Sequence, residues 1–306
     1  MIFSGFADEA GDSIDRQIQA TVELGWMNIE SRNVDGINLT DLPDEKFEIV
    51  SQKLQDAGVQ VHCFGSAIAN WGKDPRKEED FQSSLASLKR AIPRMHRLGT
   101  RLIRGMSFAI ARDSHPDDPD LENMIFSKLQ ILVRICEEGG VTYVHENCQN
   151  YGGLSHLHTL KMLDRVNSPN FRLAFDTGNP VGSDHHVGSP PYHKQSSWEF
   201  YKNVRQFIEH VHIKDCKFVA ETGETFPRLE HTFPGEGNGD VEKIVEDLLH
   251  TGYQGAFSIE PHLAVVYHDG SITSPDEIRY ANYIEYGRRF ASLVGRLNIT
   301  PVPKMN

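Results

Sequence analysis

The sequence predicts a single (β/α)8 barrel domain, a TIM barrel, that takes up residues 1–306. A short, β-rich apolar segment followed by an amphipathic helical segment recurs eight times along the chain, and this is the order expected of a parallel barrel. Most of the helical segments end at or near Gly or Asn, which commonly terminate helices. The length is also suitable, because such barrels take about 250 residues. A doubly wound open sheet is the alternative, but residues 5–11 lack the G-x-G-x-x-G motif expected after its first strand.

The first four strand–helix units extend to residue 138. Ser13 is placed to cap the first helix, and Gly25, Gly58 and Gly99 follow the first three helices. Pro93 lies within the third helix, where we expect it to kink or split that helix. The expected strands are 2–6, 26–30, 59–64 and 100–104, and the expected helices are 14–24, 45–57, 78–98 and 121–138.

The last four units begin at Val141, after two glycines. Asp240 is placed to cap the seventh helix. Two long polar loops, 178–197 and 215–239, follow the sixth and seventh strands, and they are long enough either to cover the mouth of the barrel or to contact a neighbouring subunit. The expected strands are 141–146, 171–176, 210–214 and 255–260, and the expected helices are 154–166, 198–208, 240–250 and 275–296.

Composition and charge exclude several classes of protein. The chain is 39% hydrophobic and 24% charged, without the run of roughly 18 apolar residues that would span a membrane. A formal net charge of −12 argues against a nucleic-acid partner, because clustered Lys and Arg are needed to neutralise phosphates. The four cysteines have no C-x-x-C spacing, and the first residues lack the basic and apolar regions of a signal peptide. We therefore expect reduced thiols and a cytoplasmic location.

Charged and polar residues occur where the predicted strands end. Because the carboxyl ends of the strands form the active-site face of a (β/α)8 barrel, these side chains are expected to meet at one mouth. A carboxylate in a buried parallel strand is also costly unless it reaches solvent or a cation. The residues at the predicted strand ends are Glu30, His62, Arg104, His145, Glu146, Asp176, His212 and Glu260.

Glu146, Asp176, His212 and Glu260 belong to four successive strands and should line one side of the mouth. Mutual repulsion would raise the pKa values of three neighbouring carboxyl groups, and a divalent cation would remove that repulsion. Each residue alone has a simpler interpretation, since a strand-end Glu often pairs with Lys or Arg and a single His often packs in a core. Together they predict a metal site. Oxygen-rich ligation with one His favours Mn²⁺, Mg²⁺ or Co²⁺ over Zn²⁺, and we favour one Mn²⁺.

Five short motifs resemble those of the xylose-isomerase-like superfamily, specifically its sugar phosphate isomerases/epimerases. They are V-H-E-N at 144–147, F-D-T-G-N at 175–179, V-H-I-K-D at 211–215, P-G-E-G-N-G-D-V at 234–241 and F-S-I-E-P-H at 257–262. The resemblance covers nearly the whole chain. It implies that the four residues above are the metal ligands, that Glu146 and Glu260 are an acid/base pair, and that the chain forms homo-oligomers.

The superfamily includes ketose 3-epimerases, hydroxypyruvate isomerases, inosose dehydratases, keto-glycoside lyases and endonuclease IV-type nucleases. The nucleases need a trinuclear zinc centre, and this chain lacks three of its ligands: Arg104 or Gly105, Asn179 and Leu229 stand at those places. Many relatives also have a His where Asn179 stands. The resemblance therefore favours a small-molecule sugar as the partner, and not nucleic acid.

Several other residues are candidates for contact with a sugar. Lys214 can hold a hydroxyl group, and Trp71 can stack on a sugar ring, as Phe64 and Phe108 can. His62 and Arg104 are further candidates, as is Asn179 in place of the family's His, while His145 is available as a separate catalytic base. The alternatives are simple packing for His62, His145 and Trp71, and an ion pair with Glu30 for Arg104.

These features predict a divalent-metal-dependent isomerase or epimerase that acts on a ketose or keto-sugar through an enediolate. One Glu would remove a proton and the other would return it. Two alternatives remain open: a lyase or dehydratase that performs β-elimination on a 3-keto-glycoside or related keto-sugar, and a non-catalytic sugar-binding barrel. The sequence shows no basic cluster near the mouth, so it does not support a phosphorylated substrate.

Overall fold

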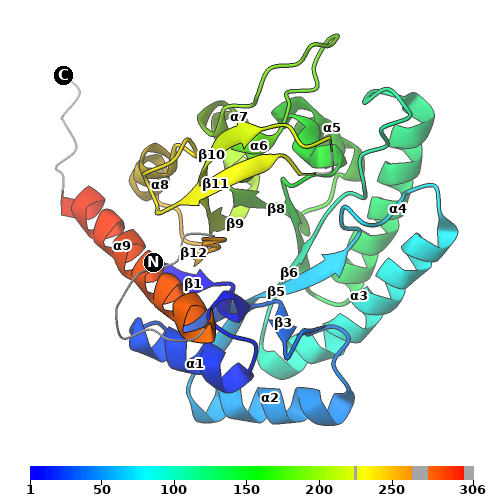
Figure 1. Ribbon diagram of the computed structural model, residues 1–306. Coiled ribbons are helices and arrows are strands. Elements are labelled where there is room, and N and C mark those ends of the chain that lie inside the picture. The colour runs from blue at the N-terminus through cyan, green and yellow to red at the C-terminus, as the bar shows by residue number, and fades with distance from the viewer. Residues whose placement is uncertain (224–225, 264–274, 300–306) are drawn as a thin grey trace.

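A computed structural model describes residues 1–223, 226–263 and 275–299, and it confirms the predicted (β/α)8 barrel (Figure 1). Eight parallel strands form one sheet in the order β1-β12-β9-β8-β7-β6-β5-β2. A parallel bridge between Phe6 and Glu30 brings the two edges together. The strands are β1 (Ile2–Gly5), β2 (Asn28–Ser31), β5 (Gln60–Ile68), β6 (Leu102–Gly105), β7 (Thr142–Glu146), β8 (Phe171–Asp176), β9 (Ile208–Ile213) and β12 (Ala256–Ile259).

The helices alternate with these strands and pack around the barrel (Figure 1). In α3, Leu88, Ala91 and Met95 recur on one face and are fully buried, which is the pattern of an amphipathic helix on a sheet. Among the described helices, none is both long and apolar enough to cross a bilayer. The helices are α1 (Ile14–Glu23), α2 (Asp44–Asp56), α3 (Glu78–Leu98), α4 (Pro119–Glu138), α5 (His156–Val166), α6 (Asn179–Gly182), α7 (Ser197–Val204), α8 (Val241–His250) and α9 (Pro275–Ile299), with short 3₁₀ turns η1 (Ala7–Glu9), η2 (Tyr151–Leu154) and η3 (Arg205–Phe207).

Helix ends follow the sequence chemistry with two exceptions. The Ser13 hydroxyl accepts a hydrogen bond from the Arg16 amide, as a cap should, and Gly99 adopts the left-handed conformation, with φ of 70°, where α3 ends. Pro93 does not split α3, which runs unbroken for 21 residues. Asp240 does not cap α8 with its side chain; its carboxylate instead accepts the amide of Trp198 at the start of α7.

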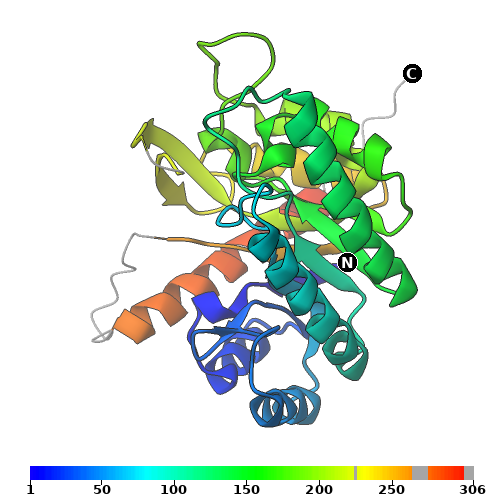
Figure 2. The same cartoon turned by 90° about the vertical axis from the view of Figure 1, so that its right-hand side faces the viewer.

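The loops at the carboxyl ends of the strands contain more structure than the sequence predicts. Residues 215–239 form an antiparallel hairpin, β10 (Asp215–Ala220) with β11 (Arg228–Thr232), which projects beyond the body of the barrel (Figure 2). A smaller pair, β3 (Asn33–Val34) and β4 (Ile37–Asn38), follows β2. The loop after α6 is held by a bridge between Asp184 and Lys194.

Candidate metal centre and active site

Four side chains from four neighbouring strands meet at the mouth of the barrel. Glu146 ends β7, Asp176 ends β8, His212 is the next-to-last residue of β9, and Glu260 follows β12 directly. Each is almost fully buried and offers a ligand atom, and these atoms lie within 4.8 Å of one another. The structure thus brings together the four residues that the sequence singled out, while their binding of a metal remains a prediction.

The imidazole of His212 faces the three carboxylates. Its Nδ1 lies 3.8 Å from Glu146 Oε1, 3.9 Å from Asp176 Oδ2 and 4.0 Å from Glu260 Oε2, and it has no hydrogen-bond partner among the described residues. Burial opposes a charge on His212, but the carboxylates of Glu30 and Glu146 outweigh it and raise the pKa of His212 to about 10. An unpartnered buried nitrogen opposite three carboxylate oxygens fits a divalent cation.

The carboxyl groups are not equivalent. Burial and the nearby carboxylates of Glu260 and Glu146 raise the pKa of Asp176 to about 7, although Lys214 opposes this. Burial also disfavours the ionised form of Glu146, but Arg104 and His212 outweigh burial and lower the pKa of Glu146 to about 2. Glu260 behaves like Glu146, because Lys214 and His262 outweigh burial and hold its pKa well below the ordinary value. Glu146 and Glu260 are therefore carboxylates at neutral pH.

Two buried cations neutralise part of this negative charge. The Arg104 guanidinium donates to Glu146 Oε2 at 3.1 Å and to the Ser66 carbonyl at 3.1 Å; it pairs with Glu146, not with Glu30. The Lys214 ammonium lies 2.9 Å from Asp176 Oδ2 and 2.9 Å from Glu260 Oε2. The sequence argument treated the carboxylates as unpaired, and these contacts correct it: a metal ion would share them with cations that the chain itself supplies.

Asn179 contacts two of the candidate ligands. Its side-chain amide donates to Glu146 Oε1 at 3.1 Å, and its backbone amide donates to Asp176 Oδ1 at 2.7 Å. Asn179 therefore orients two carboxylates, whatever contact it also makes with a substrate.

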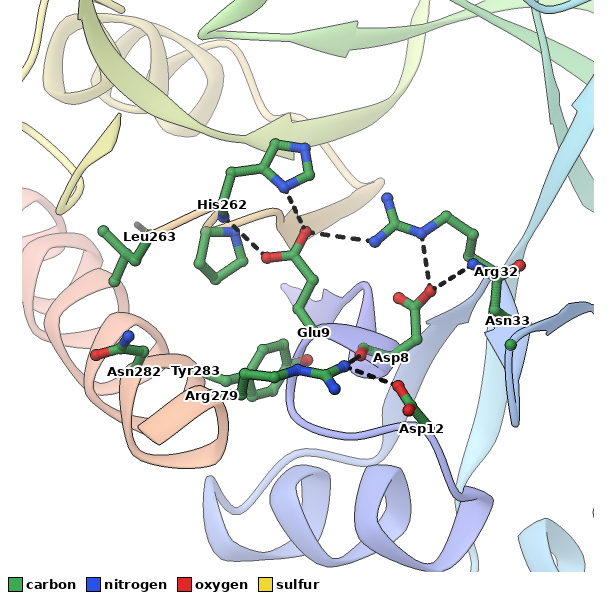
Figure 3. Close-up of a pocket in the computed structure, with 12 residues that line it drawn as sticks. Asp8, Glu9, Asp12, Arg32, Asn33, His262, Leu263, Arg279, Asn282 and Tyr283 are labelled. Carbon is green, nitrogen blue, oxygen red and sulfur yellow. Dashed lines mark hydrogen bonds and ion pairs between the residues drawn. The ribbon is translucent and has the colours of Figure 1, made fainter. Parts of the chain in front are cut away.

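A cavity of about 330 Å³ adjoins Glu260 on the side of β1, β2 and β12 (Figure 3). His262 Nε2 lies 3.1 Å and Arg32 Nη1 3.4 Å from Glu260 Oε1. Figure 3 shows the Glu9 carboxylate between His262, whose Nδ1 is 3.0 Å away, and the Arg32 guanidinium. The sequence analysis missed Glu9 and Arg32, and its one signal for His262 was the F-S-I-E-P-H motif. Glu9 lies in the short turn η1, and Arg32 and His262 follow β2 and β12, where no periodic pattern marks them.

A second cavity of about 300 Å³ lies above the loops that follow β5 to β8. Trp71 lines it, with an exposure of 38%, and meets the Phe226 ring edge-on at 5.5 Å. Trp71 is partly exposed in this cavity and packs on Phe226, and its contact with a sugar stays a prediction. Phe64 and Phe108 are fully buried and form no wall that a sugar could reach.

His145 does not reach the cluster. Successive strand residues point to opposite faces, so Glu146 points into the mouth and His145 points outward. Its Nε2 is 3.0 Å from Ser107 Oγ and 3.0 Å from Asn150 Oδ1, and burial lowers the pKa of His145 to about 4. The structure therefore corrects the prediction that His145 is a separate catalytic base.

His62 is also displaced from the mouth. Strand β5 runs on to Ile68, so His62 lies near its beginning and not at its end. It lines a cavity of about 680 Å³ formed by the amino ends of the strands, with Gln60, Thr142 and Gly255, and stacks on His210 with ring centroids 5.6 Å apart. The predicted substrate contact by His62 is thus wrong for a site at the carboxyl ends of the strands.

Comparison with known proteins agrees with the barrel fold. The family model described as xylose isomerase-like TIM barrel matches residues 18–281. Inosose dehydratase from Bacillus thuringiensis is 26% identical over 147 residues, which cover 45% of this chain and 46% of the relative. The chain thus matches less than half the length of its first curated relatives.

Two solved structures share the fold. A D-tagatose 3-epimerase-like protein is 16% identical with a TM-score of 0.71, covering 97% of this chain and 98% of its own. A xylose isomerase-like TIM barrel protein from Mycobacterium smegmatis, in complex with magnesium, is 17% identical with a TM-score of 0.66, covering 96% and 97%. At such identities the likeness shows the fold alone.

Proposed function

The chain belongs to the xylose isomerase-like TIM barrel family, and from this membership we propose that it is a divalent-metal-dependent isomerase or epimerase of a ketose or keto-sugar. The observation that carries the proposal is the convergence of three carboxylates on the unpartnered Nδ1 of His212. Family members are enzymes of this kind, and a D-tagatose 3-epimerase-like protein shares the fold.

Glu146, Asp176, His212 and Glu260 would hold the cation. When bound, it would polarise the carbonyl and adjacent hydroxyl oxygens of the sugar and so acidify the C–H bond beside the carbonyl. Three carboxylates with one imidazole favour Mn²⁺ or Mg²⁺, and we keep Mn²⁺ as the first choice. A structural neighbour was crystallised with magnesium, which supports an ion of this class.

Glu146 and Glu260 would perform the proton transfers. Their lowered pKa values keep both groups ionised at neutral pH, so either carboxylate can accept the proton from carbon, and the electron pair of that bond passes into the enediolate of the substrate. The other Glu takes up a proton from solvent while the enediolate is bound and gives it to carbon, and the first Glu releases its proton to solvent, so that both groups end as carboxylates. Return to the opposite face of the same carbon gives an epimer, and return to the neighbouring carbon gives an isomer.

The surrounding side chains would position the sugar. Lys214 and Asn179 each contact a candidate ligand and carry donors that could reach a substrate hydroxyl, and Trp71 offers an aromatic face in the cavity that Gln149 and Gly182 also line. The four cysteines are buried free thiols, which supports a cytoplasmic location. The exposed hairpin residues Phe218 and Phe226 support assembly into a homo-oligomer.

A dehydratase or lyase is the second candidate, and the similarity to inosose dehydratase favours it. Removal of the same proton would here be followed by loss of a group from the next carbon, so that a double bond forms and water or an alcohol leaves. Glu146, Asp176, His212 and Glu260 would hold the cation in this reaction too.

Product analysis separates the two candidates. Mn²⁺-loaded protein is incubated with a panel of ketoses, keto-inositols and 3-keto-glucosides, and the products are identified by ¹H NMR. An epimeric or isomeric sugar of unchanged mass supports our proposal. An unsaturated product, or release of the aglycone, would replace it with the elimination reaction, and an unchanged panel would favour a non-catalytic sugar-binding barrel.

A further inference from the structure

A fully buried carboxylate lies beneath the candidate metal centre. Glu30 on β2 has no exposed surface, and three side chains donate hydrogen bonds to it. His210 Nε2 lies 2.7 Å, Ser258 Oγ 2.8 Å and His212 Nε2 3.1 Å from Glu30 Oε2. No Lys or Arg of the described chain forms an ion pair with Glu30.

We propose that Glu30 is a positioning residue that fixes the orientation and tautomer of His212 for metal binding. The inference rests on the metal centre of the proposed function. His212 Nε2 donates to Glu30, so when a cation displaces the Nδ1 proton the remaining proton is held on the Glu30 side of the ring, and Nδ1 faces Glu146, Asp176 and Glu260. A ring turned by 180° about its Cβ–Cγ bond would place the Cδ2 carbon, and not Nδ1, toward the three carboxylates.

The backbone places Glu30 for this contact. The parallel register between β2 and β5 shifts between Ile29 and Glu30, so that Glu30 pairs with Cys63 and not with His62. Such bulges re-aim side chains and cluster near functional sites. Ser258 is the register partner of His212 on β12, and its small side chain leaves room for the Glu30 carboxylate to approach the imidazole.

The neighbouring ring on β9 holds the carboxylate in turn. His210 and His212 are two residues apart and both point into the barrel, with ring centroids 5.2 Å apart. His210 Nε2 and His212 Nε2 both contact Glu30 Oε2, and His212 Nε2 also lies 3.3 Å from Glu30 Oε1. The Phe6 ring packs against the imidazole of His212 in a T-shaped arrangement, with ring centroids 4.9 Å apart, and so limits the movement of the imidazole away from Glu30.

The charge of Glu30 is hard to explain by packing alone. A buried carboxylate without a full cationic partner is costly, and an apolar side chain of the same size would usually stabilise the core as well or better. Its three hydrogen-bond partners, His210, His212 and Ser258, are all donors, so Glu30 acts as an acceptor, which is the role that orients a metal-binding imidazole.

The test compares metal affinity with the stability of the metal-free protein. Glu30→Gln keeps the shape but removes the charge, and the side-chain NH₂ can turn toward His212. We expect Mn²⁺ affinity, measured by calorimetry on chelator-stripped protein, to fall about 10- to 100-fold. Ser258→Ala, which removes one hydrogen bond from the same carboxylate, should weaken Mn²⁺ binding less.

Glu122→Gln is the matched control. Glu122 is another buried Glu, paired with Lys161 at 2.5 Å and Tyr151 at 2.6 Å on the outside of the barrel. Glu122→Gln should lower the midpoint temperature of thermal unfolding of the metal-free protein without changing its Mn²⁺ affinity. A purely structural role for Glu30 would make Glu30→Gln behave like Glu122→Gln.

Three results would overturn the inference, and they are distinguishable. If the wild type binds Mn²⁺ and Glu30→Gln binds it equally well, the positioning role is wrong while the proposed function stands. If the wild type binds no divalent cation, the metal centre and this inference fail together. Should Glu30→Gln not fold, Glu30→Asp, whose shorter carboxylate keeps the charge but cannot span to His212, decides in its place, and unchanged affinity there contradicts the proposal.

Discussion

At the scale of single residues, two buried cations pair with the three carboxylates of the candidate centre. Arg104 serves Glu146, and Lys214 serves both Asp176 and Glu260. These pairs explain why the pKa values of Glu146 and Glu260 are lowered despite complete burial. They also mean that the centre is held together before any metal ion arrives.

Glu146→Gln should lower Mn²⁺ affinity by at least about a hundredfold, because it removes the charge of a candidate ligand. Mutation of residues that only hydrogen-bond to metal ligands already lowers metal affinity about 10- to 100-fold. It also leaves the buried Arg104 without its carboxylate, so turnover should fall below detection. Calorimetry and a product assay check both effects, with Glu122→Gln as the control. Unchanged metal content and rate would refute the assignment of Glu146.

Lys214→Met should strengthen Mn²⁺ binding but destabilise the metal-free protein. The ammonium occupies the space between Asp176 and Glu260, so its loss should raise Mn²⁺ affinity by about tenfold, or about 1.4 kcal/mol. The metal-free protein should lose roughly 3 kcal/mol of unfolding free energy, because two buried carboxylates lose their partner. Urea unfolding with and without Mn²⁺ measures this, and weaker metal binding would show that Lys214 assists the cation.

At the scale of elements, strand β7 shows how much of the site can be predicted from the sequence. Adjacent strand residues face opposite ways, so Glu146 in the mouth already requires His145 to point outward, and the sequence analysis overlooked this consequence. The His62 error has a different cause, because the end of β5 at Ile68 depends on pairing with β6 through a register shift. No local pattern marks that shift.

His145 should make stability depend on pH. Burial lowers its folded-state pKa to about 4 from 6.5, so the unfolded chain binds the proton more readily. The contribution of neutral His145 to the free energy of unfolding is complete above pH 6.5 and is lost as the pH falls toward 4, by about 3 kcal/mol. Urea unfolding at pH 7 and pH 4.5 should show a smaller loss for His145→Gln than for wild type. Equal losses would contradict the prediction.

The loop after β9 depends on one carboxylate. Asp215 accepts backbone hydrogen bonds from Cys216 at 3.0 Å, Gly235 at 2.8 Å, Gly237 at 3.0 Å and Gly239 at 2.9 Å. It thereby ties the base of the β10–β11 hairpin to the P-G-E-G-N-G-D-V segment. Spacing alone did not predict the hairpin, because the contacts that close it, such as those of Asp215, join residues 20 to 24 positions apart.

Asp215→Asn should therefore destabilise the protein by about 3 kcal/mol, since charged hydrogen bonds are lost and the amide NH₂ would face two backbone N–H donors. Chemical unfolding measures the change, and limited proteolysis should show faster cleavage within residues 226–239. The exposed Asp56→Asn serves as a control without effect. If Asp215→Asn has the same midpoint of chemical unfolding as the wild type, the stabilising role of the Asp215 carboxylate is wrong.

At the scale of the whole molecule, the barrel brings residues from positions 30 to 262 to one end of a single sheet. The eight repeats and the strand-end residues were predictable, because each follows from local periodicity and the geometry of parallel barrels. The contacts of Arg32 with Glu260 and of Glu9 with His262 were not, because they join residues 228 and 253 positions apart. Below them, the Glu30 contacts extend the polar centre into the barrel interior.

The central claim is metal-dependent proton transfer at this centre, and solvent isotope uptake tests it most directly. The protein, loaded with Mn²⁺ or stripped with chelator, is incubated in D₂O with the ketose panel, and deuterium in the recovered sugars is counted by mass spectrometry. We predict one deuterium at the carbon beside the carbonyl with the Mn²⁺-loaded protein, and none with the stripped protein or with Glu260→Gln. Absence of uptake into every sugar, or uptake that persists without metal, would contradict the account.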